Sequence, residues 1–413
     1  MINNIKNFYF SVNLKDKLLF ILFSLFPITF ILGNFLINLT FLIISIIFII
    51  SIIKNKNYFF TKDPIFWILF IFFISLIINL FFSIDLSNSI NRVLKILLII
   101  SFILQIKEFI KKYEIEFENI IFGFWSFVFL IVLLDGVFEI IFGFNTLGFS
   151  TPLTGRIAGF FGDELVLGAF FHSFCLIFVC YVFSLFKEYK KIILTIILSL
   201  IVLSLLIGER SNFIKIFLSL SCLSFFVVKL KFKYFLTSFI LLFSILFTFV
   251  SFNHEAKNRY YDQLVHYGKI NNFFKGSLYG AHYNAAYKIF KEYPIFGIGV
   301  KNFRIESGKE KYRNDKFVLT EFRSTTHPHQ MHLEILSETG IFGYTFFLIF
   351  ILSSLFLSIK NYLKYKNMFQ LSGIIYVIFY LTPILPSGSF FSTFSSGLFW
   401  INYSIMVSYI KNN

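Results

Sequence analysis

Histidine is concentrated in one short polar segment of this 413-residue sequence. The segment from Ser324 to Gly343 contains His327, His329 and His332, and Pro328 directly precedes His329. Because proline favours the first turn of a helix, the sequence predicts that His329 lies in such a turn. A helix N-terminus disfavours the imidazolium, so we expect His329 to be neutral and able to act as a general base. A histidine that merely caps the helix is the alternative interpretation.

A metal site is another interpretation of the same histidines. The spacing of His327, His329 and His332 lets only some of them share one helical face. No nearby pattern of cysteines or carboxylates completes a zinc signature. We therefore predict a site with no metal and no cofactor, in which His327 and Gln330 bind substrate beside His329.

Arg210 is the second residue type that could do chemistry. It lies in the segment Gly208-Glu-Arg-Ser-Asn212, a short turn between two apolar stretches. An arginine at a membrane boundary is costly unless it is paired or hydrated, and its planar fork suits phosphate oxygens. A pair with Glu209, or an interaction with lipid headgroups, is the structural alternative.

Arg156 lies in the glycine-rich segment from Thr154 to Glu164. Glycines in such a segment permit close approach of the backbone to a ligand. Arg156 is therefore a candidate contact for phosphate or sugar, although the same pattern fits an ordinary re-entrant turn.

A fourth segment, from Tyr283 to Gly299, has the pattern of an amphipathic helix that ends at Pro294 and is followed by a glycine-rich turn. The sequence predicts that this helix lies outside the membrane and covers a lateral groove at its surface.

The composition of the chain shows what must position these residues. Hydrophobic residues make up 57% of the sequence and charged residues only 14%. The apolar residues form blocks of about 20, the length that a helix needs to cross a bilayer, and they do not alternate as in a β-barrel. We therefore predict an all-α fold, a polytopic bundle of about 12 transmembrane helices. The expected spans are 18–33, 35–53, 65–83, 89–106, 120–143, 163–186, 191–208, 212–229, 234–252, 338–359, 368–386 and 394–410.

The distribution of basic residues predicts the orientation of these spans. With the N-terminus in the cytoplasm, the cytoplasmic loops collect most of the lysines, and the short outside loops hold only Arg92, Arg156 and Arg210. Both termini are then cytoplasmic. The net charge of +15 is explained by this orientation, without a nucleic acid partner.

Three parts of the chain follow from this arrangement: nine spans in residues 1–252, a large and mostly helical extracytoplasmic loop in residues 253–337, and three spans in residues 338–413. The loop contains six of the seven histidines. Its basic character suits an anionic ligand.

Together these segments resemble the O-antigen ligase and O-antigen polymerase superfamily of bacterial envelope glycan enzymes. The ligase pattern is a His, then Asn, Ser or Gln, nine residues, a Gly, two residues, then Gly, Thr or Tyr. His329, Gln330, Gly340 and Gly343 occupy these positions. The segment from Pro294 to Gly299 and the turns at Arg210 and Arg156 are also similar to the family's. The resemblance covers roughly residues 150 to 350.

The resemblance implies a metal-independent, inverting glycosyltransferase at the periplasmic face of the bacterial inner membrane. The implied donor is a glycan on undecaprenyl pyrophosphate, and the implied acceptor is a sugar hydroxyl of the lipid A-core; membrane lipids surround both. The resemblance also implies that His329 deprotonates the acceptor hydroxyl and that Arg210 binds the pyrophosphate.

One position departs from the family pattern. The family has a further arginine early in the loop helix, where this chain reads Ser277-Leu-Tyr-Gly-Ala-His282. His282 is expected to bind substrate in its place, and Arg259, Arg304 and Arg323 are the other cations that could do so.

Other functions remain open at this stage. Within the superfamily, the alternative is the polymerase that extends the repeat-unit chain, followed by a protein O-oligosaccharyltransferase. From another class, a membrane transporter would need ionisable residues near the middle of the bilayer. The few candidates for that role are Lys95, Asp135, Glu139 and Lys215.

Overall fold

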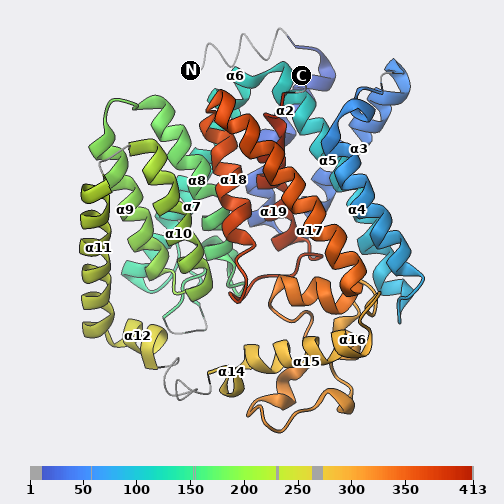
Figure 1. Cartoon of the computed structure of the whole chain (residues 1–413). Helices are drawn as coiled ribbons and strands as arrows, with labels where there is room; N and C mark the ends of the chain where they lie inside the picture. The colour runs from blue at the N-terminus through green and yellow to red at the C-terminus, as the bar shows by residue number, and fades with distance from the viewer. Residues whose placement is uncertain are drawn as a thin grey trace. The chain divides into compact units, whose positions relative to one another are not determined.

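The computed structural model describes residues 12–56, 58–151, 153, 155–228, 232–262 and 273–411. All regular elements in these ranges are helices, which confirms the predicted all-α fold class (Figure 1). The main helices are α2 (Leu14–Leu32), α3 (Asn34–Asn55), α4 (Pro64–Leu80), α5 (Leu86–Lys112), α7 (Phe122–Phe142), α8 (Leu167–Leu185), α9 (Lys190–Leu206), α10 (Arg210–Val228), α11 (Phe232–Phe252), α15 (Leu278–Glu292), α17 (Met331–Tyr365), α18 (Met368–Tyr380) and α19 (Phe394–Ser408). Short helices join them: α6 (Glu114–Glu116), α12 (His254–Lys257), α14 (Phe273–Gly276) and α16 (Phe303–Glu306).

Five helices in the described residues are long and apolar enough to cross a membrane: Asn34–Lys54, Glu114–Phe142, Leu167–Leu185, Arg210–Val228 and Met331–Tyr365. Their outer faces expose large apolar side chains; on α17, for example, Leu352 is 62% and Phe356 is 67% exposed. Such faces are stable in lipid and unfavourable in water. The chain is therefore an integral membrane protein. The total of about 12 spans stays a prediction.

Local sequence signals explain where several helices end. Gly33, with a φ of 110°, separates α2 from α3, so the predicted break between the first two apolar blocks lies at this residue. The predicted span 368–386 is too long at its C-terminal end, because α18 ends at Tyr380. Pro383 and Pro386 follow within six residues, and a proline cannot continue a helix without losing a hydrogen bond.

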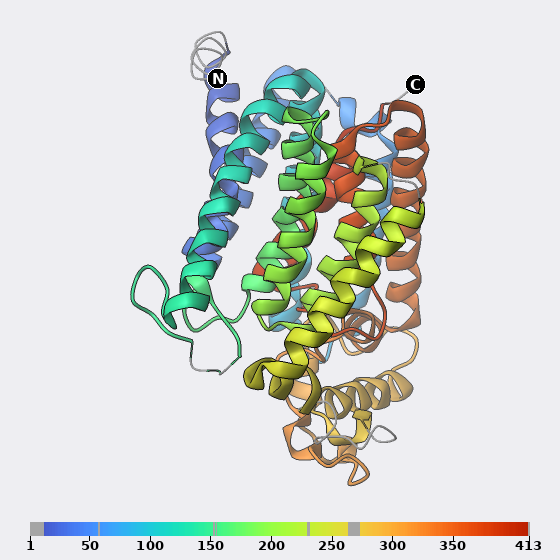
Figure 2. The same ribbon diagram turned by 90° about the vertical axis from the view of Figure 1, so that its left-hand side faces the viewer.

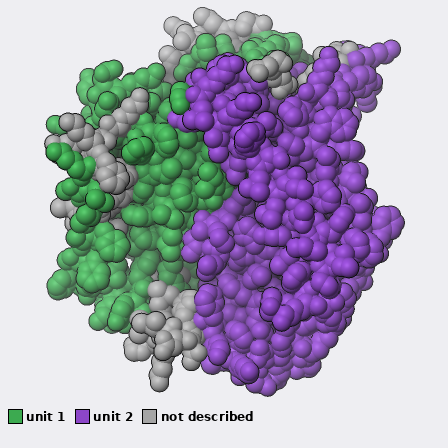
Figure 3. All heavy atoms as spheres, in the orientation of Figure 1, with its two compact units in different colours: residues 1–40, 109–263, 366–380 green, residues 41–108, 264–365, 381–413 purple. Residues whose placement is uncertain are grey.

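The chain divides into two compact units (Figure 3). Unit 1 contains residues 1–40, 109–263 and 366–380, and unit 2 contains residues 41–108, 264–365 and 381–413. Each unit is therefore built from segments that are far apart in the sequence, and each is described by itself.

Unit 1 is a group of helices in which α8 contacts α7, α9, α10 and α18. Figure 2 shows α8, α9 and α10, drawn in green to yellow-green, side by side. A buried polar group lies among them: His172 Nε2 is 3.0 Å from Ser219 Oγ, and the His172 ring packs on Tyr376. Buried polar side chains are stable in an apolar interior only when they are hydrogen-bonded, as these are.

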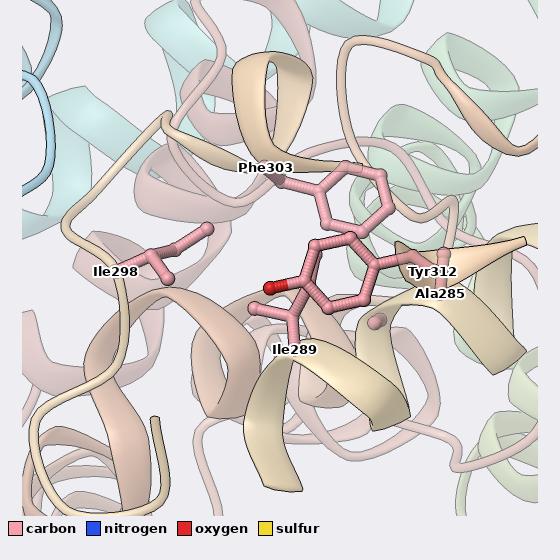
Figure 4. Packing of buried hydrophobic residues seen from close by; sticks show 6 residues of the cluster. Ala285, Ile289, Ile298, Phe303 and Tyr312 are labelled. Atoms are coloured by element: carbon pink, nitrogen blue, oxygen red, sulfur yellow. The ribbon is translucent and has the colours of Figure 1, made fainter. Parts of the chain in front are cut away.

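In unit 2, α17 packs along α4, and the amphipathic helix α15 contacts α17 (Figure 1). Phe72 of α4 stacks on Phe350 of α17 with ring centroids 5.1 Å apart. A separate apolar cluster holds the loop region of this unit together, and it comprises Ala285, Ala286, Ile289, Ile298, Phe303 and Tyr312. Figure 4 shows Tyr312 beside Phe303 and Ile289, so the apolar face of α15 is covered by the loop that follows it.

The long helix α17 is broken at Gly340, whose φ of 64° and ψ of −172° are far from helical. The break frees backbone groups that the turn after α15 satisfies. Pro294 and Ile295 carbonyls accept hydrogen bonds from the N–H groups of Ile341 and Phe342 at 2.8 and 3.0 Å. On the other side of the break, the N–H of Gly299 donates to the carbonyl of Glu338 at 2.8 Å. A break in a membrane helix is tolerated when its freed groups find such partners.

Candidate functional site

His329 lies two residues before the first residue of α17 and has a φ of 54°. The prediction that it occupies the first helical turn is therefore wrong. Pro328 by itself favours the helical turn, and the difference comes from a distant segment: the N–H of Ser387 donates to the His329 carbonyl at 2.8 Å. The Ser387 hydroxyl accepts from the N–H of Met331 at 2.9 Å. A left-handed backbone at a residue other than glycine costs energy and persists only where its surroundings hold it.

Three imidazole rings gather at this point of unit 2. The His329 ring centroid is 4.2 Å from that of His327 and 5.2 Å from that of His282 on α15. The Tyr279 ring, one turn earlier on α15, is 5.9 Å from His329. The sequence predicted that both of the other histidines contact substrate, and the structure brings all three rings together.

Burial keeps these imidazoles neutral. It lowers the pKa of His329 to about 3, with smaller contributions from His327 and His282, while the carboxylate of Glu334 acts in the opposite direction. Burial and the nearby Lys301 ammonium lower the pKa of His327 to about 4. Burial also lowers the pKa of His282, against the effect of its bond to a backbone carbonyl. The predicted neutral state of His329 thus arises from desolvation and neighbouring groups and not from a helix dipole.

His282 is held in a defined orientation. Its Nε2 is 2.9 Å from the carbonyl oxygen of Phe322, and because a carbonyl only accepts, Nε2 carries the proton. Its Nδ1 is therefore an acceptor, and it is buried without a hydrogen-bond partner within the described residues. Such an atom is available to a group that enters the site.

Gln330 has a structural contact of its own. Its side-chain oxygen accepts from the N–H of Leu333 at 2.6 Å, which caps the N-terminus of α17. This contact orders the backbone directly after His329. A contact between Gln330 and a substrate stays a prediction.

His332 has hydrogen-bond partners of its own, apart from the other histidines. Its Nε2 is 2.8 Å from the Leu381 carbonyl oxygen, and its Nδ1 is 3.2 Å from the Tyr344 hydroxyl. The metal set of His327, His329 and His332 is therefore not assembled. Across the part of the chain that the structure describes, no group of three or more His, Cys, Asp or Glu side chains has the arrangement of a metal site.

A buried charge cluster beside the histidines was not predicted from the sequence. Glu334, in the first turn of α17, is fully buried and accepts hydrogen bonds from Ser389 Oγ at 2.5 Å and the Phe390 N–H at 2.8 Å. The Lys301 ammonium lies 3.6 Å from the same carboxylate and donates to Ser389 Oγ. The available signal was a pair of glutamates, Glu334 and Glu338, spaced one helical turn apart at the start of a predicted membrane span.

Glu338 supports the same region from the next turn of α17. Its carboxylate accepts from the N–H groups of Lys301 at 2.8 Å and Phe303 at 3.3 Å, at the start of α16. Lys301 itself has a φ of 66°. Buried carboxylates with this many donors fix the backbone around them.

In unit 1, Arg210 is the first residue of α10, directly after Gly208 and Glu209. Gly208 has a φ of 79°, and a Cβ there would lie 2.0 Å from the carbonyl oxygen of Gly155. Only glycine fits this contact. The turn that carries Arg210 is thus packed against the loop that carries Arg156.

Glu209 links the two loops to a helix. Its carboxylate accepts from the Gly168 N–H at 2.8 Å, at the N-terminus of α8, and from the Asn212 side chain at 2.6 Å. Arg156 lies 3.7 Å from Glu209 and donates to the Leu165 carbonyl at 3.1 Å. These contacts give Arg156 a structural role, and its contact with a substrate stays a prediction.

The other candidate cations differ in their surroundings. Arg323 is buried and donates to the carbonyls of Thr320 and Gly308 and to Glu310, so it stabilises the loop. Arg304, on α16, is exposed and its charge reaches His327. The side chain of Arg259 lies outside the described residues.

The acidic residues that a transporter would use are hydrogen-bonded to a loop. Asp135 accepts from the Thr146 N–H at 2.9 Å. Glu139 accepts from the N–H groups of Ala158 at 3.1 Å and Gly159 at 2.6 Å. Both carboxylates of α7 thus anchor the segment that follows this helix, which favours a structural role over ion transport.

Residues 166–348 match the protein-family model described as O-antigen ligase, Wzy_C. This range includes Arg210, α15, the histidine cluster and the break at Gly340, and it confirms the resemblance to the O-antigen ligase and polymerase superfamily. A comparison with curated proteins found no match.

Proposed function

From the O-antigen ligase domain at residues 166–348, we propose that this chain is an inverting glycosyltransferase that attaches O-antigen-type glycan to the lipid A-core. The family supports glycosyl transfer of the ligase or polymerase type and lipid-linked glycan substrates. The observation that carries the proposal is the half-buried imidazole of His329, whose pKa is lowered by burial, with two further imidazoles around it. A site of this kind can take a proton from a hydroxyl.

The proposed reaction uses His329 as the general base. The hydroxyl oxygen of the acceptor sugar forms a bond to the anomeric carbon of the donor, and the bond between that carbon and the pyrophosphate oxygen breaks. The hydroxyl proton passes to His329, and undecaprenyl pyrophosphate leaves. Attack opposite the leaving group inverts the anomeric configuration.

The leaving pyrophosphate needs positive charge and no general acid. Arg210 provides a guanidinium at the N-terminus of the 19-residue helix α10, where the helix dipole also favours an anion. We assign pyrophosphate binding to Arg210, with His282, His327, Gln330 and Arg156 as further substrate contacts.

The proposed location is the bacterial inner membrane. Apolar helices and the family support an integral membrane protein. We propose the multi-pass arrangement of about 12 spans, with residues 253–337 as the periplasmic loop, both termini cytoplasmic and the active site at the periplasmic face. Both substrates are lipid-linked, so the enzyme meets them within the bilayer that surrounds it. Neither a metal nor a cofactor takes part in this mechanism.

A deletion strain examined on a lipopolysaccharide gel tests this function. A ligase is indicated by free lipid A-core together with accumulated lipid-linked polymer. Core that bears a single repeat unit would identify a polymerase, and unchanged lipopolysaccharide with altered glycoproteins would identify protein glycosylation.

Complementation of this strain then tests the base. His329→Ala should not restore the ladder of capped lipopolysaccharide, although the variant should be present in the membrane at the wild-type level. His254→Ala is the matched control, because His254 is an exposed histidine of α12 and should restore the ladder. A normal ladder with His329→Ala would refute the base role.

A further inference from the structure

Glu334 occupies a position between the catalytic histidine and the segment 381–393. It is fully buried in the first turn of α17, and its own N–H donates to the Gln330 carbonyl at 2.9 Å. Its carboxylate holds Ser389 and the Phe390 N–H of the distant segment. A buried carboxylate is costly unless it is paired, and Lys301 provides the counter-charge.

The segment 381–393 in turn fixes His329. Ser387, two residues before Ser389, donates its N–H to the His329 carbonyl and accepts from Met331 through its hydroxyl. Glu334 and Ser387 therefore connect the same two segments at two places, one at the left-handed residue and one in the first turn of α17. Loss of the Glu334 contacts would remove the second connection.

Glu334 also acts on His329 through its charge. The groups near the His329 ring are the neutral imidazoles of His282 and His327 and the phenol of Tyr279. The charges of Lys301 and Arg304 act on His327. Among the residues that the structure describes, the carboxylate whose field reaches His329 and favours its protonated form is that of Glu334.

We propose that Glu334 is a positioning residue of this site, which holds the segment 381–393 against His329 and stabilises the imidazolium that forms when His329 takes the acceptor proton. This inference rests on the proposed transferase function. Because the imidazolium exists only as the reaction proceeds, the charge of Glu334 should lower the barrier and should contribute little to binding of the substrates.

The test uses the purified full-length protein in proteoliposomes. The donor is undecaprenyl pyrophosphate bearing the glycan of the source strain, and the acceptor is lipid A-core extracted from the deletion strain. Glu334→Gln should lower kcat about tenfold, because the imidazolium that forms in the reaction loses a nearby carboxylate and the ground state does not. KM for both substrates should change by less than about twofold, since ground-state binding is unaffected.

Two further variants support the interpretation. Glu292→Gln is the matched control, because Glu292 is a half-exposed carboxylate at the far end of α15 that pairs with Lys311, and it should leave kcat unchanged. If Glu334→Gln does not fold because Lys301 is left unpaired, Lys301→Gln combined with Glu334→Gln removes both charges. This neutral pair still lacks the carboxylate whose charge favours the imidazolium of His329, so kcat should fall by a similar factor.

The outcomes separate this inference from the proposed function. Wild-type kcat in a folded Glu334→Gln protein, or a loss seen only as a higher KM, would overturn the role of Glu334 and leave the transferase assignment intact. An inactive wild-type protein in the same assay, with intact lipopolysaccharide in the deletion strain, would instead remove the proposed function.

Discussion

Replacement of Gly340 by alanine tests whether the broken helix positions the site. A Cβ at Gly340 would lie 2.2 Å from the carbonyl oxygen of Ile295 and 2.6 Å from the N–H nitrogen of Phe296. Both atoms belong to the backbone of the turn after α15, so a side chain cannot rotate away to make room. The turn would have to move, and it carries the carbonyls that satisfy Ile341 and Phe342.

The expected loss of stability has two parts. The backbone of residue 340 lies in a region that is almost restricted to glycine, which costs alanine about 1–3 kcal/mol. Displacement of the turn weakens two backbone hydrogen bonds, each worth about 1 kcal/mol. Gly340→Ala should therefore lower the free energy of unfolding by about 3–5 kcal/mol in total. The glycan transfer activity should fall with it, because α15 carries His282 and moves with the turn.

Unfolding in SDS, followed by tryptophan fluorescence of the detergent-purified protein, measures this difference. Gly143→Ala is the matched control: its φ of 78° is also left-handed, but a Cβ there has no atom within 4 Å among the described residues. Its cost should be about 1 kcal/mol, that of the backbone alone. Equal losses for the two variants would refute the close contact between Gly340 and the turn.

Four further predictions concern the chemistry and the loops. Because the pKa of His329 is lowered to about 3, kcat/KM for the acceptor should stay constant as the pH is lowered to about 5. An imidazole of ordinary pKa, about 6.5, would already be protonated at that pH. A decline in kcat/KM that begins near pH 6.5 would contradict this prediction. The lowered pKa of His329 should also make stability depend on pH. Between about pH 6.5 and 3, His329 binds a proton in the unfolded state and not in the folded state, so the free energy of unfolding should fall as the pH is lowered through this range. Activity of the purified protein should survive treatment with a chelator, whereas a loss that zinc reverses would indicate a metal site. Glu209→Gln should destabilise the protein by about 1–3 kcal/mol in the same SDS titration, since Glu209 caps α8 and pairs with Arg156, and an unchanged midpoint would exclude that role.

The features that the sequence predicted well are those set by neighbouring residues. Gly33 separates two apolar helices, and Pro294 lies two residues beyond the end of α15, as their backbone preferences require. In both cases the determining preference lies within a few residues along the chain. The spacing from His329 to Gly340 and Gly343 also identified a segment that the O-antigen ligase family model matches.

The features that the sequence did not predict depend on distant segments. The left-handed backbone of His329 is stabilised by its hydrogen bond with Ser387, 58 residues further along the chain. Pro328 alone favoured the helical alternative. Likewise, Lys301 and Glu334 become a pair only when the turn after α15 lies against α17. No local propensity contains this information, because tertiary packing decides it.

The low basicity of His329 restricts how the proposed reaction can proceed. An imidazole with a pKa near 3 cannot remove a proton from a free sugar hydroxyl, whose pKa is far higher. The proton becomes acidic only as the hydroxyl oxygen shares its electrons with the anomeric carbon and the pyrophosphate departs. Proton transfer must then accompany bond formation rather than precede it. The desolvation that weakens this base also keeps it free of a proton in the resting enzyme. The proposed stabilisation by the Glu334 carboxylate therefore acts mainly when the imidazolium forms.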